Sequence, residues 1–348
     1  MKAAVLYGKE DVRVEEIQPR PLEAGEVRIK IEAALTCGTD LKVFKRGYHA
    51  KMIVPPAVFG HELSGTIAEV ASQGGGAGGA LWNIGDRVVV ANSAPCGECF
   101  HCSQRQENLC ENLIFLNGAY AESIVVPARL VQKNLLRLKP GTDFRDAALV
   151  EPLACVVQGV EDTGLTQGQR VLVLGAGPIG LMFLVLAKHL GCEVTVAGRR
   201  APRLDAARRL GAANVIDIGD GYGLVTKVRE ASKTGYDVVI EAVGRPETWE
   251  SSVHLVRKGG KVNFFGGCPS GATVTLDTTL IHYSNLTLLA SFHHTPRTIR
   301  RALEFIESGV VHSRDFVDGE HPLTELPGLF KAMTSGNQAI KTLIRVGE

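Results

Sequence analysis

The chain has 348 residues, of which 45% are hydrophobic and 22% charged, and its formal net charge at pH 7 is +1. This length exceeds what one ordinary core supports and favours two domains. The near-neutral charge gives no basis for a nucleic-acid or membrane-surface partner. The longest apolar run, residues 181–187, is too short to span a bilayer, and the N-terminus lacks the layout of a signal peptide. We therefore expect a cytoplasmic globular protein.

Residues 1 to about 149 are expected to form a mostly antiparallel β domain. Short segments in which polar and apolar residues alternate, separated by Gly, Pro and Asp, are typical of such strands. The clearest examples are residues 27–31, 65–70 and 87–90. The glycine-rich stretch 74–79 is expected to be a surface loop.

Four cysteines within this domain have the spacing of a metal site. Cys96, Cys99, Cys102 and Cys110 are separated by two, two and seven residues, in a lobe of about residues 94–112. Four thiolates on one compact lobe form a closed tetrahedral zinc site, so we expect a structural zinc here. Reactive redox cysteines are the alternative. We favour zinc, because binding an ion also explains why such a loop is ordered.

The pattern changes after about residue 150, where apolar strands alternate with helical segments. Repeated strand–helix units of this kind specify a parallel, doubly wound sheet, and we assign it to residues 150–290. The remaining segment, 291–348, is predicted to contain a helix over 298–308 and a strand over 341–346 that returns to the first domain. The predicted strands of the sheet are 171–174, 193–197, 214–216, 237–240, 261–265 and 286–290, and its clearest helices are 178–189 and 202–210.

A glycine-rich turn follows the first of these strands and opens a helix. The sequence Gly175-Ala176-Gly177-Pro178-Ile179-Gly180 has the GxGxxG pattern in the strand–turn–helix context that dinucleotide binding requires. Its glycines allow backbone N–H groups and the helix N-terminus to approach a pyrophosphate. A glycine-rich turn that binds nothing is the alternative interpretation.

The end of the next strand bears on which nicotinamide is used. An NAD site has an acidic residue there to bind the ribose hydroxyls. This chain has Gly198, followed by Arg199, Arg200 and Arg203, whose guanidinium groups suit a 2′-phosphate. We therefore expect NADP(H) in preference to NAD(H). Alternatively, Arg200 and Arg203 are solvated helix charges, and only Arg199 selects the cofactor.

Taken with the four-cysteine lobe and the GxGxxG turn, several further motifs resemble the zinc-containing medium-chain dehydrogenase/reductase superfamily from end to end. Within it, Glu62 and the Glu151-Pro152-Leu153 element resemble the polyol (sorbitol) dehydrogenase-like branch. The resemblance implies an α/β fold. It has a β-rich GroES-like catalytic domain, residues 1–149 and 291–348, and a Rossmann domain, 150–290. The further motifs are Cys37-Gly38-Thr39-Asp40, Gly60-His61-Glu62, Gly85-Asp86-Arg87-Val88 and Gly118-Ala119-Tyr120-Ala121-Glu122.

The resemblance also implies a catalytic zinc held by Cys37, His61 and Glu62. Glu151 either binds that zinc directly or hydrogen-bonds its water, and Thr39 receives the substrate's hydroxyl proton. The chain would then hold two zinc ions, one catalytic and one structural. Further cofactor contacts are implied for Val243, Phe265 and Ser291.

Three positions depart from the family pattern. Where relatives carry a relay histidine this chain has Lys42, which either relays the proton, holds a phosphorylated substrate or belongs to a solvated basic loop. His293-His294 stands near where sorbitol dehydrogenases place an Arg-Tyr pair, and Phe44 replaces a substrate-contacting tyrosine. These differences make sorbitol itself a poor candidate.

We therefore expect a zinc-dependent oxidoreductase that transfers hydride between a secondary alcohol and NADP(H), interconverting alcohol and ketone. The substrate class is a polyol, sugar alcohol or sugar phosphate, and the protein is expected to be a homodimer or homotetramer. A threonine-dehydrogenase-like or simple secondary-alcohol dehydrogenase is the alternative among enzymes. A catalytically silent zinc-binding scaffold is the alternative outside them. A zinc-free quinone reductase would lack the ligands that this chain has.

Overall fold

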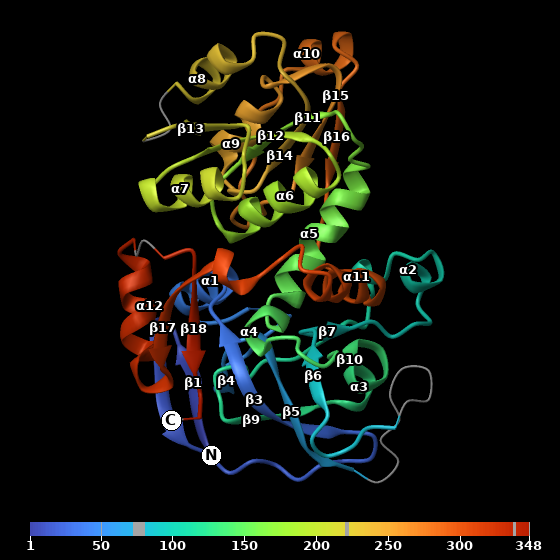
Figure 1. Ribbon diagram of the computed structural model, residues 1–348, viewed down its shortest axis with the longest axis vertical. Coiled ribbons are helices and arrows are strands. Elements are labelled where there is room, and N and C mark those ends of the chain that lie inside the picture. Colours follow the sequence, from blue (N-terminus) through green and yellow to red (C-terminus); the bar gives the residue numbers. More distant parts are fainter. Residues whose placement is uncertain (50, 72–80, 220–222, 337–338, 348) are drawn as a thin grey trace. The chain divides into compact units, whose positions relative to one another are not determined.

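The computed structural model describes residues 1–49, 51–71, 81–219, 223–336 and 339–347 (Figure 1). The glycine-rich stretch 74–79 lies outside the described residues. The chain divides into two compact units. Unit 1 comprises Met1–Ala154 and His294–Glu348, and unit 2 comprises Cys155–His293.

Unit 1 is built on a mostly antiparallel sheet, as the alternating sequence pattern predicts. The C-terminal strand β18 pairs antiparallel with β3 and parallel with β17, so the end of the chain does return to the first sheet. In spatial order the strands are β10 (Leu135–Arg137), β6 (Arg87–Val90), β5 (Glu62–Val70), β3 (Val27–Leu35), β18 (Lys341–Arg345) and β17 (Val317–Pro322), and β9 (Ser123–Val126) also pairs with β3.

Two smaller sheets and several helices complete the described part of unit 1. The smaller sheets are β2 (Asp11–Glu16), β1 (Lys2–Gly8) and β4 (Ala57–Val58), in that order, and the pair β7 (Ser93–Ala94) and β8 (Ile114–Phe115). The helices are α1 (Gly38–Arg46), α2 (Phe100–Ser103), α3 (Ala128–Asn134), α4 (Phe144–Ala147), α11 (Pro296–Glu307) and α12 (Leu326–Thr334).

Aromatic side chains from distant segments meet in the core of unit 1. Phe44 stacks on Phe330 with ring centroids 5.3 Å apart, and Phe59 lies 5.3 Å from the same ring. Tyr120 packs edge-on against Phe59 at 5.8 Å. All four rings are almost fully buried. Phe44 is therefore a core residue that fixes α1 against α12.

Unit 2 contains the predicted parallel, doubly wound sheet. Its first strand lies in the middle, and the chain then adds strands outward on one side and afterwards on the other. The strand order reverses between β11 and β14, and at such a point open α/β sheets bind ligands beyond the carboxyl ends of the strands. In spatial order the strands are β13 (Asn214–Asp217), β12 (Glu193–Gly198), β11 (Arg170–Leu174), β14 (Tyr236–Glu241), β15 (Val256–Phe264) and β16 (Thr287–Ala290).

Helices connect the strands of unit 2. Helix α6 packs on β11 and β12, α7 on β12 and β13, and α9 on β14 and β15. Helix α5 (Val150–Thr163) runs from the last residues of unit 1 into unit 2. The helices of the sheet are α6 (Pro178–His189), α7 (Ala201–Arg209), α8 (Leu224–Ala231), α9 (Pro246–Ser252) and α10 (Thr278–Tyr283).

The predicted helix over 298–308 begins two residues earlier than expected. Thr295 caps it, because its hydroxyl accepts the N–H of Thr298 at 3.2 Å while the Thr298 hydroxyl accepts the N–H of Thr295 at 2.9 Å. Pro296 occupies the first helical turn, where a missing N–H costs nothing. The capping pair therefore sets the start of α11.

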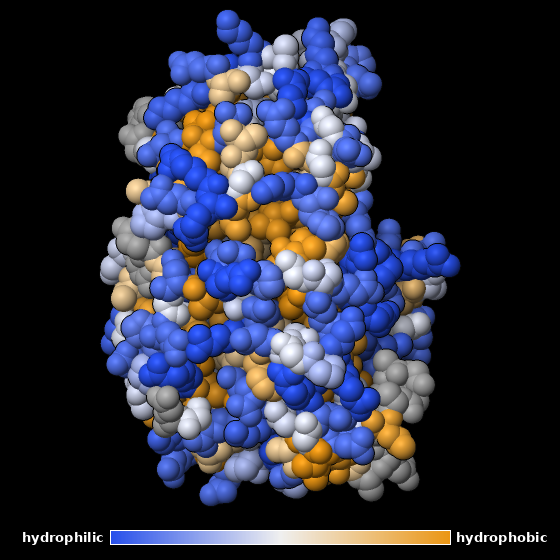
Figure 2. Space-filling model, viewed as in Figure 1, coloured by the Kyte–Doolittle hydropathy of each residue, from blue (hydrophilic) through white to orange (hydrophobic). Residues whose placement is uncertain are grey.

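Among the described residues no helix is both long and apolar enough to cross a bilayer. On the face drawn in Figure 2, hydrophilic side chains cover most of the surface and hydrophobic side chains are interspersed among them.

Candidate functional site

Three side chains of unit 1 form a candidate catalytic metal centre. The ligand atoms of Cys37, His61 and Glu62 lie within 4.8 Å of one another. Cys37 caps the N-terminus of α1, and its sulfur accepts the N–H of Thr39 at 3.4 Å. His61 and Glu62 stand at the start of β5. A helix start and a strand start thus bring together residues that the sequence separates by more than twenty positions.

The donor set fits a zinc ion. Thiolate, imidazole and carboxylate are its ordinary protein ligands, and three of them leave one position open for substrate. Glu62 Oε1 is buried and has no hydrogen-bond partner among the described residues. A buried carboxylate oxygen is costly unless something compensates its charge, which a metal ion would do.

A buried aspartate orients the histidine of this centre. Asp40 Oδ1 lies 2.8 Å from His61 Nδ1, and the Tyr120 hydroxyl donates to Asp40 Oδ2 at 2.6 Å. Because a carboxylate only accepts, Nδ1 carries the proton and the lone pair of the neutral ring lies on Nε2. Such a carboxylate–histidine pair is the usual support of a zinc-binding imidazole.

A buried lysine that no sequence motif indicates reaches the same centre. Lys341 opens β18, and its ammonium forms an ion pair with Glu62 Oε2. It also donates to the carbonyl oxygen of Thr36 at 2.8 Å. The only sequence signal is a lysine at the start of the predicted strand 341–346.

Glu151 lies near the centre but outside the group of three mutually close ligand atoms. It is buried at the start of α5, and burial raises its pKa to about 7. Its carboxylate lies within 4.8 Å of a ring nitrogen of His294, and His294 Nε2 is 2.9 Å from Asn92 Oδ1. His294 is therefore buried in unit 1 and held by Asn92.

The two residues predicted to handle the proton differ in exposure. Thr39 is half-buried in the first turn of α1, directly beside Cys37. Lys42, one turn further along the same helix, is exposed.

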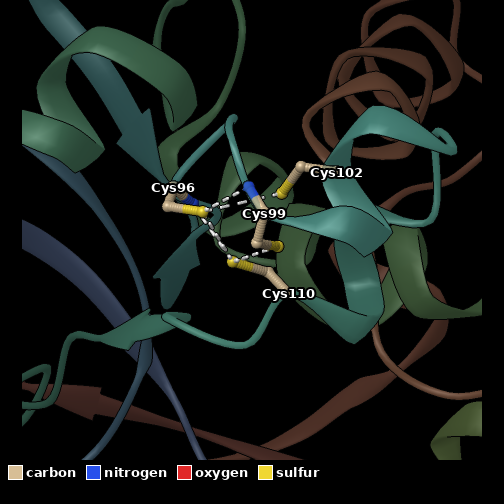
Figure 3. Close-up of side chains that lie close together, drawn as sticks. All are labelled: Cys96, Cys99, Cys102 and Cys110. Atoms are coloured by element: carbon tan, nitrogen blue, oxygen red, sulfur yellow. Dashed lines mark hydrogen bonds between the residues drawn. The ribbon is translucent and has the colours of Figure 1, made fainter.

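The four cysteines of the lobe converge as their spacing predicts (Figure 3). The sulfur of Cys96 lies 3.5 Å from that of Cys110 and 4.0 Å from that of Cys102, and those of Cys99 and Cys110 are 3.9 Å apart. Four sulfurs about 2.3 Å from a zinc ion would be about 3.8 Å apart at the corners of a tetrahedron. The observed separations fit that geometry.

The pKa values of the cysteines in the lobe are shifted in opposite directions by their surroundings. N–H groups of Glu98 and Cys99 directed at the Cys96 sulfur lower the pKa of Cys96 to about 6. Burial raises the pKa of Cys102 to about 12. A zinc ion would supply the positive charge that all four thiolates require together.

A cavity of about 1060 Å³ in unit 2 contains most of the predicted cofactor residues. It lies at the carboxyl ends of β11, β12 and β14, next to the reversal in strand order. The predicted residues among its walls are Gly175, Gly177, Gly198, Arg199, Arg200, Arg203 and Val243.

Two glycines of the turn are required by geometry. Gly175 has φ +114°, a conformation that residues with side chains rarely adopt. A Cβ on Gly180 would lie 1.8 Å from the carbonyl oxygen of Gly175, so only glycine lets α6 pack so closely on the turn. Pro178 and Ile179 form the first turn of α6 between them. The arrangement leaves the N-terminus of α6 open toward a pyrophosphate.

Arg245 is a cavity residue that sequence reasoning missed. It caps α9, and the turn before it is held by the buried Glu241, whose Oε1 accepts the N–H groups of Val243 at 2.9 Å and Gly244 at 3.0 Å. The Thr248 hydroxyl donates to the same oxygen at 2.7 Å. Among the described residues, the cavity is therefore lined by four arginines and one acidic residue, Glu247.

Five predicted cofactor residues are not among those that line this cavity: Pro178, Ile179 and Gly180, at the start of α6, and Phe265 and Ser291. Phe265 packs edge-on against Phe183 with ring centroids 4.9 Å apart. The buried Ser291 hydroxyl accepts a hydrogen bond from Asn263 Nδ2 at 3.0 Å. The roles of all five as cofactor contacts remain predictions.

Comparison with known proteins identifies the family. Residues 23–136 match the alcohol dehydrogenase GroES-like domain, and residues 178–308 match the zinc-binding dehydrogenase family. A sorbitol dehydrogenase of Bombyx mori is 30% identical over 355 residues, covering 99% of this chain and 98% of that protein. An L-threonine 3-dehydrogenase of Pyrococcus furiosus is 34% identical over 288 residues, covering 81% and 79%.

A solved structure from Sinorhizobium meliloti 1021, bound to NADP, superimposes with a TM-score of 0.87 at 28% identity, covering 99% of this chain and 98% of that one. The GroES-like and Rossmann fold class predicted from the sequence is thereby confirmed. The chain belongs to the zinc-containing medium-chain dehydrogenase/reductase superfamily, in its polyol dehydrogenase-like branch, and is an oxidoreductase.

Proposed function

We propose that this oxidoreductase transfers hydride between a secondary alcohol and NADP(H), interconverting alcohol and ketone. The observation that carries the cofactor preference is the cavity of unit 2, where Arg199, Arg200, Arg203 and Arg245 surround the glycine-rich turn and Gly198 replaces the acidic residue of an NAD site. Guanidinium groups bind phosphate oxygens in pairs of hydrogen bonds. The arginines therefore suit a 2′-phosphate.

We propose two zinc ions per chain. Cys37, His61 and Glu62 would hold the catalytic ion, with Glu151 next to it, and the four cysteines of the lobe would hold the structural ion. When bound, zinc at the catalytic centre supplies a Lewis acid that makes a substrate hydroxyl more acidic, and NADP⁺ supplies the hydride acceptor.

In this proposal the residues of the chain bind, orient and move the proton. Asp40 fixes the ring of His61, and Lys341 fixes Glu62. Thr39, half-buried beside Cys37, accepts the hydroxyl proton of the substrate. The exposed Lys42 is the next group along α1 that can pass the proton to solvent or contact a phosphate.

The proposed substrate class is a polyol, a sugar alcohol or a sugar phosphate. Similarity to a sorbitol dehydrogenase supports a polyol, while the buried His294, held by Asn92, differs from the substrate residues expected of that enzyme. Similarity to an L-threonine 3-dehydrogenase supports the alternative, an amino alcohol or a simple secondary alcohol.

A steady-state screen tests the proposal. Polyols, sugar phosphates, threonine and simple secondary alcohols are assayed with NADP⁺ and with NAD⁺, and the metal content is measured by mass spectrometry. We expect two zinc ions per chain and a higher kcat/KM with NADP⁺. Equal or better efficiency with NAD⁺ would refute the cofactor proposal, and one zinc per chain would refute the catalytic centre.

The cofactor test is best made at the arginines. A Cβ on Gly198 would lie 2.6 Å from the Cβ of Ala176, so Gly198→Asp also displaces the glycine-rich turn. We further infer a homodimer or homotetramer, which sedimentation velocity would measure, and a cytoplasmic location, where unpaired thiols stay reduced.

A further inference from the structure

The ion pair between Lys341 and Glu62 places a positive charge inside the candidate metal centre. The side chain of Lys341 is 2% exposed and that of Glu62 is fully buried. Cys37 and Glu151 are also near enough to interact electrostatically with Lys341. A buried lysine is rare, and removing its charge from water is costly even when it is paired. The burial of Lys341 beside Glu62 therefore needs an explanation.

Lys341 is held in place by the strand that carries it. The N–H of Thr342 donates to the Thr36 hydroxyl at 3.0 Å, and the N–H of Thr36 donates to the Thr342 carbonyl oxygen at 2.9 Å. The Lys341 ammonium donates to the Thr36 carbonyl oxygen at 2.8 Å. Because Thr36 precedes Cys37, β18 connects the segment of one proposed ligand to the carboxylate of another.

The two oxygens of Glu62 therefore have different surroundings. Oε2 is occupied by the ammonium, whereas Oε1 is buried without a hydrogen-bond partner among the described residues. Without the ammonium, both oxygens would be available to a cation held beside Cys37 and His61. Carboxylates bind metals through one or two oxygens, and the choice changes the coordination number.

We propose that Lys341 is a positioning residue that restricts Glu62 to binding the metal through a single oxygen and so keeps a coordination position open. The inference rests on the proposed catalytic centre. In this proposal β18 influences the coordination of the metal through the ion pair between Lys341 and Glu62.

Cobalt replacement provides a readout that does not depend on activity. The visible d–d bands of Co²⁺ are stronger in four-coordinate than in five-coordinate sites, because geometry governs their intensity. The protein is loaded with cobalt as the wild type, Lys341→Met, Lys341→Arg, Glu62→Gln and the double variant Lys341→Met/Glu62→Gln. The lobe site contributes equally to all spectra, so differences report the centre.

We expect the bands of Lys341→Met to weaken and move to shorter wavelength, and those of Lys341→Arg to stay close to the wild type. In the Glu62→Gln background, which has no carboxylate, removing Lys341 should leave the spectrum unchanged. Lys261→Met is a control, because the Lys261 ammonium donates to the Thr163 carbonyl oxygen, at 2.8 Å in unit 2. A purely structural role would lower the melting temperature without changing the spectrum.

A wild-type spectrum for folded, cobalt-loaded Lys341→Met would overturn the inference, as would a difference between Glu62→Gln and the double variant. If Lys341→Met does not fold, Lys341→Gln loses the charge and keeps one N–H donor, and an unchanged spectrum there overturns the inference equally. Wild-type protein that binds only one cobalt, in the lobe, would instead refute the proposed centre itself.

Discussion

Asp40 connects a proposed zinc ligand, His61, to a buried tyrosine, Tyr120. Its two carboxylate oxygens bind His61 and Tyr120 separately, so the imidazole is fixed through a side chain that begins eighty residues further along the chain. The orientation of a proposed zinc ligand thus depends on a hydroxyl in the aromatic core of unit 1.

Replacing that tyrosine should weaken both the fold and the metal site. Tyr120→Phe leaves one Asp40 oxygen without its donor, which should cost about 1–3 kcal/mol in the free energy of unfolding. Zinc affinity should fall by about 10–100-fold, as is typical when the support of a ligand is lost. Urea unfolding and competition with a chelator would measure the two effects.

Tyr7→Phe is the matched control for this change. The Tyr7 hydroxyl donates to Glu15 at 2.7 Å on the surface, so its removal should leave both quantities near the wild type. Wild-type zinc affinity in Tyr120→Phe would contradict the proposed link between Asp40 and the metal.

The arginines of the cavity should contribute more to the binding of 2′,5′-ADP than to the binding of 5′-AMP. Arg199→Ala and Arg245→Ala should each weaken 2′,5′-ADP by about 10–100-fold, since a hydrogen bond to a charged group contributes about 1.5–3 kcal/mol. Binding of 5′-AMP, which lacks the 2′-phosphate, should change much less. Isothermal titration calorimetry measures both ligands.

Arg208→Ala is a suitable control, because Arg208 lies on α7 outside the cavity and pairs with Asp205 at 2.6 Å. Equal losses for 2′,5′-ADP and 5′-AMP would mean that the arginines serve the nucleotide in general and do not select NADP.

At the scale of elements, the sequence predicts best those helices whose ends and apolar faces are marked by neighbouring residues. Helix α6 has the predicted bounds, because Gly177 and Pro178 mark its start and a continuous apolar pattern follows. Helix α5 was not predicted, since Pro152 and Gly159 are signals against a helix. Pro152 is tolerated because it lies in the first turn, and α5 is stabilised by its almost complete burial.

The four-cysteine lobe is an element whose order we expect to depend on the proposed structural zinc ion. Its described residues include only short helices and the two-residue strands β7 and β8, so little else stabilises it. Cys99→Ser should reduce the zinc content from two ions per chain to one. It should also open residues 96–110 to limited proteolysis.

Cys192→Ser tests whether a cysteine change elsewhere has the same effect. Cys192 is buried in unit 2, where its sulfur donates to the Thr166 carbonyl oxygen at 3.3 Å, and its replacement should leave two zinc ions bound. Two zinc ions in Cys99→Ser as well would contradict the structural site.

At the scale of the whole molecule, each unit has its own hydrophobic core. Unit 1 contains both proposed metal sites, and unit 2 contains the proposed nucleotide site. Ligands should therefore stabilise the units separately. In hydrogen exchange, 2′,5′-ADP should protect the glycine-rich turn and the ends of β12 and β14. Removing zinc with a chelator should speed exchange in α1 and β5. Protection of α1 by the nucleotide fragment would contradict this separation.

The sequence predicted the fold class, the lobe and most of the cofactor cavity because each is encoded by residues close together in the chain. The proposed catalytic ligands could be grouped only through family resemblance, since no local pattern joins Cys37 to His61 and Glu62. Lys341 and Arg245 were missed for the same physical reason. Their roles arise from tertiary contacts, and a lysine or an arginine on its own predicts only a solvated charge.

The pairing of β18 with β3 has a consequence for how the protein is made. Four lobe thiols lie within residues 96–110, so a ribosome releases a complete structural site early in synthesis. The Lys341–Glu62 pair joins residues 279 positions apart, and it can form only after unit 2 has been synthesised as an insertion within unit 1. Because domains fold as units during synthesis, we expect the two zinc ions to be acquired in sequence. The proposed catalytic ion would enter its finished environment only after β18 has been synthesised.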